Sequence, residues 1–145
     1  MKQELLSLPV TQSDETPTQV IGDSDRPNSK CYVWVHRSGE FYKERPVVIY
    51  EYQKGRDHEK PLEFYRNYKG VLVTDSLEQY HLLDKKLPGV TNANCWAHAR
   101  RAFADAVKAA DKKDPGAVKS SVAYQALQKI AEFYRIDTEL KELPA

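Results

Sequence analysis

The spacing of apolar residues changes part-way along this chain of 145 residues, and that change limits the folds it can adopt. Residues 31–36 and 47–53 are rich in β-branched and aromatic side chains, which predicts two strands. A first strand is expected around residues 10–21. Residues 22–30 concentrate Gly, Pro, Asp, Asn and Ser, so they predict a hairpin loop. Three consecutive antiparallel strands should result.

Beyond Asp57, apolar residues at helical spacing alternate with short strand-like runs. Leu62, Tyr65 and Tyr68 predict one side of a short helix that ends at Gly70. The expected elements that follow are a strand at 71–73, a helix capped by Ser76, a weaker strand within 90–95, and helices from Trp96 and Val118. Strands that alternate with helices need crossover connections, so these later strands should add in parallel.

The order of elements predicts an α/β fold with three antiparallel strands, then parallel additions, flanking helices and a carboxyl-terminal helical segment. A right-handed crossover would place the fourth strand beside the first. Asp14 and Asp75 then approach each other, although roughly 60 positions separate them in the sequence. Two carboxylates at neighbouring strands form a hard oxygen site suited to Mg²⁺ or Mn²⁺. Most acidic residues are ordinary surface charges, so spacing alone does not establish the site.

Composition sets the remaining limits. Lys and Arg total 22 against 21 for Asp and Glu, so a nucleic-acid role must rest on local features, not on the overall charge. Cys31 and Cys95 are far apart, and the amino terminus lacks the apolar core of a signal peptide, which favours a cytoplasmic location. Apolar runs are too short to cross a membrane, so a soluble protein is expected.

Four segments, in this order and with these separations, resemble the transposases of the insertion sequence 66 family. They are residues 14–17 (DETP), 32–35 (YVWV), 69–75 (KGVLVTD) and 95–101 (CWAHARR). The resemblance implies a ribonuclease H-like catalytic domain whose DDE acids bind Mg²⁺ or Mn²⁺. It makes Asp14 and Asp75 the first two acids. The implied reaction cleaves and joins DNA at the element ends and the target by metal-dependent phosphoryl transfer.

The residues before Pro9 predict a leader at 1–12, and the resemblance implies an incomplete catalytic core at 13–112 and the start of a helical insertion at 113–145. The family's third acid lies beyond that insertion, and Glu132, Glu139 and Glu142 are poor substitutes for it. The amino-terminal DNA-binding and zinc-binding portions of the intact family are also expected to be missing from this chain. Ser76 and Leu77 replace a usual Gly and aromatic residue. The chain by itself is therefore expected to be nearly inactive.

Several basic residues are candidates for DNA contact, each with an ordinary alternative. His98 is predicted either to orient a scissile phosphate or a metal-bound water, or to be a polar residue on a helix face. Arg100 and Arg101 either bind phosphate through guanidinium forks or form a solvated face. Arg56 lies in a turn-rich loop with His58, where polarity alone explains such residues.

Two further patterns favour structural interpretations. Cys95 and His98 have the spacing of half a zinc site, but a packed Cys and a polar His are the simpler interpretation. Tyr32 and Trp34 are expected in the core and not as a platform for bases. The Leu and Ile stripe of the last helix should pack against protein outside this chain or a second copy, which predicts a homo-oligomer.

Two alternative functions follow from these patterns. The first is a non-catalytic transposase remnant that binds DNA or intact transposase. The second, ranked last, is a host-domesticated nuclease of the same fold, which would need another acid.

Overall fold

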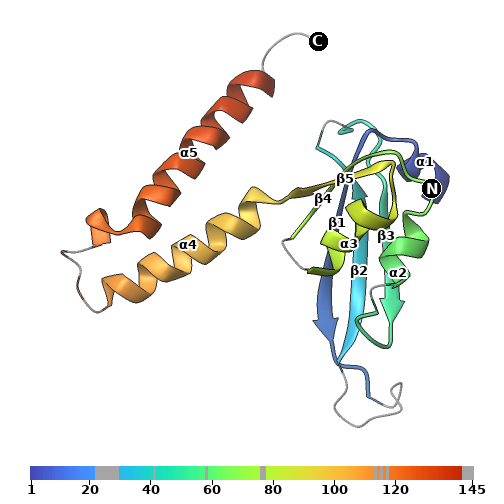
Figure 1. Cartoon of the computed structure of the whole chain (residues 1–145), viewed down its shortest axis with the longest axis horizontal. Coiled ribbons are helices and arrows are strands. Elements are labelled where there is room, and N and C mark those ends of the chain that lie inside the picture. The colour runs from blue at the N-terminus through green and yellow to red at the C-terminus, as the bar shows by residue number, and fades with distance from the viewer. Residues whose placement is uncertain are drawn as a thin grey trace. The chain divides into compact units, whose positions relative to one another are not determined.

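A computed structural model describes residues 1–21, 30–40, 42–57, 59–75, 78–112, 114, 116 and 118–141. The chain forms two compact units, Met1–Cys95 and Trp96–Ala145 (Figure 1). The first unit contains α1 (Lys2–Leu6), β1 (Val10–Thr18), β2 (Cys31–Ser38), β3 (Val48–Gln53), α2 (Glu59–Phe64), β4 (Gly70–Thr74), α3 (Glu78–Lys86) and β5 (Val90–Asn94). The second contains α4 (Trp96–Asp111), a short 3₁₀ turn (Val118–Ser120) and α5 (Val122–Lys141).

The sheet of the first unit has the strand order β3-β2-β1-β4-β5. β1 pairs with β2, and β2 with β3, in antiparallel fashion. β4 then pairs in parallel with β1, and β5 in parallel with β4. The predicted α/β class, the antiparallel trio and the parallel additions are all confirmed. The predicted hairpin loop at 22–30 falls, except for Lys30, outside the described residues.

The two ladders of β1 have different lengths, and this difference positions the candidate site. On the β2 side the pairing runs from Thr11 to Thr18. On the β4 side it spans only Val10 to Gln12, opposite Val71 to Val73. β1 therefore continues past the carboxyl end of β4. The later residues of β1 lie beside the segment that follows β4.

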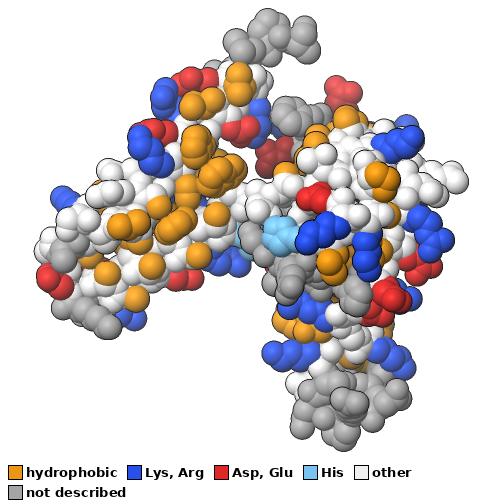
Figure 2. All heavy atoms as spheres, viewed as in Figure 1, with side chains coloured by type: hydrophobic (Ala, Val, Ile, Leu, Met, Phe, Trp, Pro, Cys, Tyr) orange, Lys and Arg blue, Asp and Glu red, His pale blue; other side chains and the backbone are white. Residues whose placement is uncertain are grey.

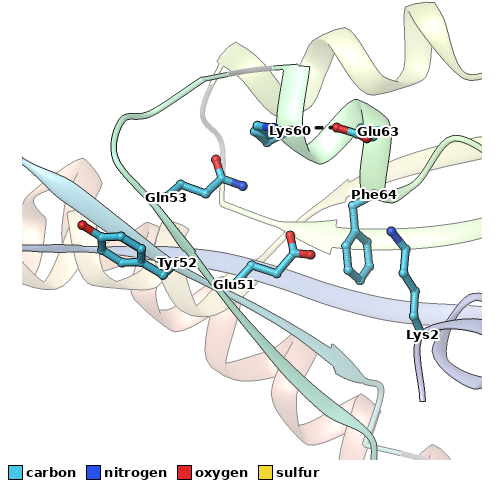
Figure 3. A pocket seen from close by; sticks show the side chains of 7 residues that line it. All are labelled: Lys2, Glu51, Tyr52, Gln53, Lys60, Glu63 and Phe64. Atoms are coloured by element: carbon cyan, nitrogen blue, oxygen red, sulfur yellow. Dashed lines mark ion pairs between the residues drawn. The ribbon is translucent and has the colours of Figure 1, made fainter. Parts of the chain in front are cut away.

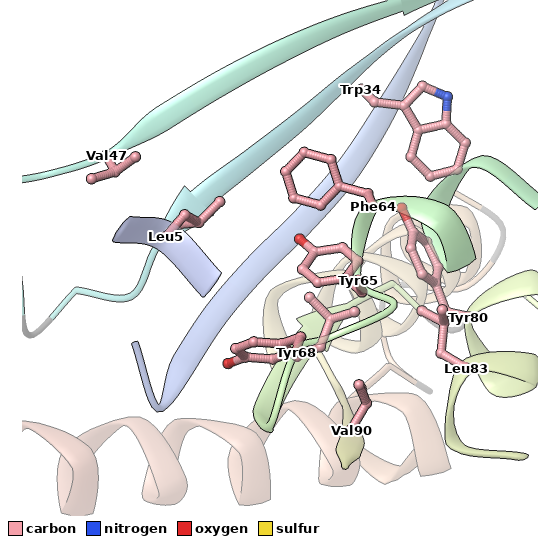
Figure 4. Close-up of a cluster of buried hydrophobic side chains, with 10 residues drawn as sticks. Leu5, Trp34, Val47, Phe64, Tyr65, Tyr68, Tyr80, Leu83 and Val90 are labelled. Atoms are coloured by element: carbon pink, nitrogen blue, oxygen red, sulfur yellow. The ribbon is translucent and has the colours of Figure 1, made fainter. Parts of the chain in front are cut away.

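The core lies against one face of this sheet, and half of its residues are aromatic (Figure 4). Strand alternation points Trp34 and Leu72 to this face, where both are fully buried. Tyr80 and Leu83 from α3 are also fully buried, as the predicted helical stripe requires. The full cluster consists of Leu5, Trp34, Val47, Phe64, Tyr65, Tyr68, Leu72, Tyr80, Leu83 and Val90. The prediction that Trp34 belongs to the core is confirmed.

Three elements differ from the predicted boundaries. Residues Lys2–Leu6, within the predicted leader, form a helix, α1, and Leu5 is fully buried among the core residues of the sheet unit. α2 ends at Phe64, before the predicted end at Gly70, and the N–H of Tyr68 donates to the carbonyl of Tyr65 in the turn that follows. β1 ends at Thr18, opposite the first residue of β2.

The second unit is a pair of packed helices with little buried apolar surface. The rings of Trp96 and Phe133 lie 5.0 Å apart, and Ile130 is 3% exposed. Several apolar side chains of the unit are nevertheless exposed, and Figure 2 shows hydrophobic side chains gathered along these helices. The most exposed are Trp96, Val122, Phe133, Tyr134, Ile136 and Leu140. None of the described helices is long and apolar enough to span a membrane.

Gly70 begins β4 in a backbone conformation, φ 156°, that side-chain-bearing residues rarely adopt. A Cβ there would lie 2.6 Å from the Pro9 carbonyl oxygen and 2.7 Å from the Tyr68 hydroxyl. We expect Gly70→Ala to lower the free energy of unfolding by about 1–3 kcal/mol. Urea denaturation measures this loss, with Gly55→Ala as the control because a Cβ at Gly55 meets nothing within 4 Å. Equal stability of the two variants would contradict the steric argument.

Candidate metal site

Three carboxylates converge where β1 passes the end of β4. Asp14, Glu15 and Asp75 each offer an oxygen, and these oxygens all lie within 4.8 Å of one another. Asp14 is exposed on one face of β1, the adjacent Glu15 is buried on the other, and Asp75 follows the last residue of β4. The structure thus brings together the two carboxylates that topology predicted, and it adds Glu15.

Hydrogen bonds fix the backbone that carries these acids. The N–H of Glu15 donates to Asp14 Oδ1 at 3.0 Å, which orients the Asp14 side chain along β1. At the end of β4, the N–H of Cys95 donates to the Thr74 carbonyl at 2.7 Å. The Thr74 hydroxyl lies 2.8 Å from Asn92 Oδ1 and 2.8 Å from the Asp75 carbonyl. The segment that carries Asp75 is therefore held against β5.

Glu15 has two strong partners on its two carboxylate oxygens. Arg56 Nε donates to Glu15 Oε1 at 2.9 Å, and the Arg56 terminal nitrogen also contacts that oxygen. The Tyr80 hydroxyl donates to Glu15 Oε2 at 2.7 Å. Burial, and then the negative charge of Glu15, raise the pKa of Tyr80, so this hydroxyl keeps its proton and remains a donor.

Arg56 was predicted as a DNA contact, and the structure places it on the carboxylate cluster. Its guanidinium also lies over the ring of Tyr32, 5.5 Å from the ring centroid. The hydrogen bond to Glu15 raises the pKa of Arg56, and the charge of Asp75 acts in the same direction. Arg56 therefore has a defined place beside the acids. Its predicted contact with DNA stays a prediction.

The other predicted contacts lie on the second unit. His98, Arg100 and Arg101 occupy the first turns of α4, where the two arginines are exposed and His98 is half-buried. Their contributions to the site stay predictions. Among the described residues, the only cluster with metal-ligand geometry consists of acids, so Cys95 and His98 do not form part of one. His58 and Ser76 lie outside the described residues.

The glutamates of α5 make ion pairs along their own helix. Glu132 lies 3.1 Å from Lys129, and Glu139 lies 2.7 Å from Arg135. These pairs are exposed and of the kind that stabilises a helix surface. Glu142 lies outside the described residues.

A separate pocket of about 440 Å³ lies between β3 and α2 (Figure 3). Its lining combines Lys2 and Lys60 with Glu51 and Glu63, so its charges balance. Lys60 and Glu63 lie 3.8 Å apart. The three clustered carboxylates do not line this pocket. Because its charges balance, it offers no positively charged surface for a phosphate.

The carboxylate cluster has the chemistry of a hard-cation site. All its donors are oxygens, as Mg²⁺ and Mn²⁺ prefer, and Asp14 is open to solvent. Three carboxylates and one guanidinium leave two formal negative charges, which match one divalent cation. Sequence reasoning missed Glu15, although its position on the core face of β1, beside Asp14, marks it as a buried acid that needs a partner.

Comparison with known proteins assigns the family. The sequence model described as "Transposase IS66 family" matches residues 1–145. An uncharacterized protein, y4hP, from Sinorhizobium fredii (strain NBRC 101917 / NGR234) is 33% identical over 107 residues, which cover 69% of this chain and 19% of that protein. The chain thus spans about a fifth of that relative's length. No solved structure matches the chain. Since the family match extends over all 145 residues, the chain belongs to the IS66 family of transposases.

Proposed function

We propose that this chain supplies Asp14 and Asp75 as two ligands of a catalytic Mg²⁺ or Mn²⁺ in a transposase that cleaves and joins DNA. The observation that supports this proposal is the convergence of the two carboxylates within 4.8 Å, on neighbouring strands of a member of this family. The antiparallel trio with two parallel additions supports a ribonuclease H-like catalytic domain. We place the reaction in the cytoplasm, with element ends and target as the DNA partners.

The residues of the site have distinct roles in this proposal. Asp14 and Asp75 would hold the divalent cation, which would supply activation of the attacking oxygen and stabilisation of negative charge on the phosphodiester. Asp14, exposed on β1, contributes an oxygen from the solvent side, where DNA approaches. Asp75 contributes the second oxygen from a backbone fixed by the Thr74 and Cys95 hydrogen bonds. Such sites ordinarily include a third acid. Catalytic activity is therefore proposed for the whole enzyme and not for this chain alone.

DNA contact is proposed for the exposed basic residues at the start of α4. Arg100 and Arg101 present guanidinium groups that bind phosphate in a bidentate manner. His98, one turn earlier, is proposed to hold a phosphate or a bound water in place. The net charge of +1 gives no general attraction for DNA, so binding should depend on these local groups.

Mn²⁺ binding tests the proposed ligands directly. Asp14→Asn and Asp75→Asn should each weaken Mn²⁺ binding by about tenfold or more, because each removes a charged ligand from a small set. Electron paramagnetic resonance of free Mn²⁺ measures the affinity at neutral pH. Asp105→Asn is the matched control, since Asp105 is exposed on α4 and pairs with Lys108.

A plasmid-nicking assay with Mg²⁺ or Mn²⁺ tests the reaction. Any nicking by the chain, alone or in a longer family protein, should fall to background in Asp75→Ala. Cleavage that survives this substitution, or unchanged Mn²⁺ affinity in both Asn variants, would reject Asp14 and Asp75 as ligands.

A second role, binding to another transposase chain without catalysis, is favoured by the exposed apolar side chains of α4 and α5. Phe133, Ile136 and Leu140 are between 44% and 60% exposed. We infer that a second copy of the chain packs on them to form a homo-oligomer. Sedimentation equilibrium should then show a dimer that Ile136→Glu dissociates, and a monomer at all concentrations would exclude this role.

A further inference from the structure

The ion pair between Glu15 and Arg56 lies inside the carboxylate cluster, and its geometry bears on how the cluster takes a cation. Arg56 contacts Glu15 through two nitrogens, and the Tyr80 hydroxyl donates to the other oxygen of Glu15. The Glu15 side chain is 1% exposed, whereas 40% of the Arg56 side chain reaches solvent. Glu15 is thus a buried acid with partners on both of its oxygens.

We propose that Glu15 is a positioning residue held back from the cation by Arg56 and Tyr80, and that Arg56 sets the affinity of the site by offsetting one carboxylate charge. This inference rests on the proposed metal-binding function of Asp14 and Asp75. It assigns different roles to two adjacent acids of β1. Asp14 binds the cation, and Glu15 anchors the strand that carries Asp14.

The anchoring role follows from the elements that Glu15 connects. Its partners come from the loop after β3, through Arg56, and from α3, through Tyr80. Asp75 lies at the end of β4, shortly before α3 begins, so the Tyr80 contact ties the Asp75 side of the site to β1. A rigid separation between Asp14 and Asp75 favours cation binding, because less order must be imposed when the ion binds.

The charge role follows from electrostatics at short range. A guanidinium beside the acids repels a divalent cation, and this repulsion is partly screened because Arg56 reaches solvent. Loss of its charge should therefore tighten cation binding. Loss of the Glu15 charge should have the opposite effect, since Arg56 then stands unneutralised beside Asp14 and Asp75.

A double-mutant cycle on Mn²⁺ affinity separates these roles from direct ligation. At low ionic strength we expect Arg56→Gln to raise the affinity about three- to tenfold and Glu15→Gln to lower it by a similar factor. Glu15→Gln with Arg56→Gln restores the formal charge, so its affinity should return to within about threefold of the unsubstituted chain. Arg66→Gln is the control, since Arg66 is exposed and precedes the amino end of β4.

Each outcome of the cycle decides one point. If the double variant stays as weak as Glu15→Gln, the Glu15 carboxylate itself, and not the charge of Arg56, supports cation binding, and the proposed charge role is wrong. If Arg56→Gln does not raise the affinity while Asp14→Asn and Asp75→Asn abolish binding, this inference fails and the metal site stands. If neither Asn variant changes binding, the proposed function itself fails. If circular dichroism shows that Glu15→Gln is unfolded, the Mn²⁺ affinity of Arg56→Gln alone tests the charge role. A gain in affinity cannot result from unfolding.

Discussion

Replacing Trp34 by alanine is expected to lower the free energy of unfolding by about 3–5 kcal/mol. Trp34 is fully buried on β2, and its ring meets the edge of the Tyr80 ring at a centroid distance of 5.9 Å. It also stacks near the ring of His36, at 6.4 Å. Alanine leaves a cavity between the sheet and α3 that these aromatic rings are too rigid to fill. Urea denaturation followed by circular dichroism measures the loss.

Trp34→Phe provides the informative comparison. The buried indole nitrogen of Trp34 has no hydrogen-bond partner among the described residues, so phenylalanine removes volume without breaking a hydrogen bond. We expect a loss of about 1–2 kcal/mol for this variant. Tyr50→Ala serves as the surface control, since Tyr50 is 70% exposed on β3, and should change stability by about 0.5 kcal/mol or less. A loss in Trp34→Ala no larger than in Tyr50→Ala would exclude Trp34 from the core.

Much of the sheet is predictable from residue spacing because each strand carries its own signal. Residues 31–36 alternate between two covered faces, and they form most of β2 in the middle of the antiparallel trio. The pairing of β4 with β1 followed from the rule for crossover connections, not from any residue of β4 itself. α1 was missed because a helix of five residues is unstable by itself and forms here through the burial of Leu5.

The candidate site was predictable only where it depends on topology. Asp14 and Asp75 approach each other because their strands are neighbours, and strand order can be inferred from the sequence. The contact between Glu15 and Arg56 joins residues 41 positions apart through a loop. No spacing rule fixes the direction of that loop. The stripe of α5 was predicted from its spacing, and Phe133, Ile136 and Leu140 are exposed, but periodicity gives the face of a helix and not its partner.

His36 should make the stability of the protein strongly dependent on pH. Its ring is 1% exposed and stacks on Phe64 at a centroid distance of 3.8 Å. Its Nδ1 lies 3.0 Å from both the Ser13 and Tyr65 hydroxyls. Burial raises the pKa of Tyr65, so its hydroxyl keeps its proton beside the imidazole. The core therefore favours uncharged His36.

Burial, and then the charge of Lys2, lower the pKa of His36 from 6.5 to about 3 in the folded protein, although Glu51 lies 3.6 Å from Nε2. The unfolded chain gains this proton below its ordinary pKa of 6.5, whereas the folded protein gains it only near pH 3. The unfolded state thus binds more protons across this window, so stability is complete above pH 6.5 and falls as the pH decreases toward 3. We expect His36 to account for a loss of about 3 kcal/mol between pH 7 and 4.

Comparison of pH profiles isolates this contribution from the titration of carboxylates, which all variants share. His36→Gln removes the ionisable ring. Between pH 7 and 4, this variant should therefore lose about 3 kcal/mol less free energy of unfolding than the unsubstituted chain loses. His81→Gln is the matched control, because His81 is exposed on α3, and its profile should follow that of the unsubstituted chain. Parallel profiles for all three proteins would mean that the core tolerates the imidazolium. The Glu51 carboxylate would then compensate for the burial of that charge, despite the repulsion from Lys2.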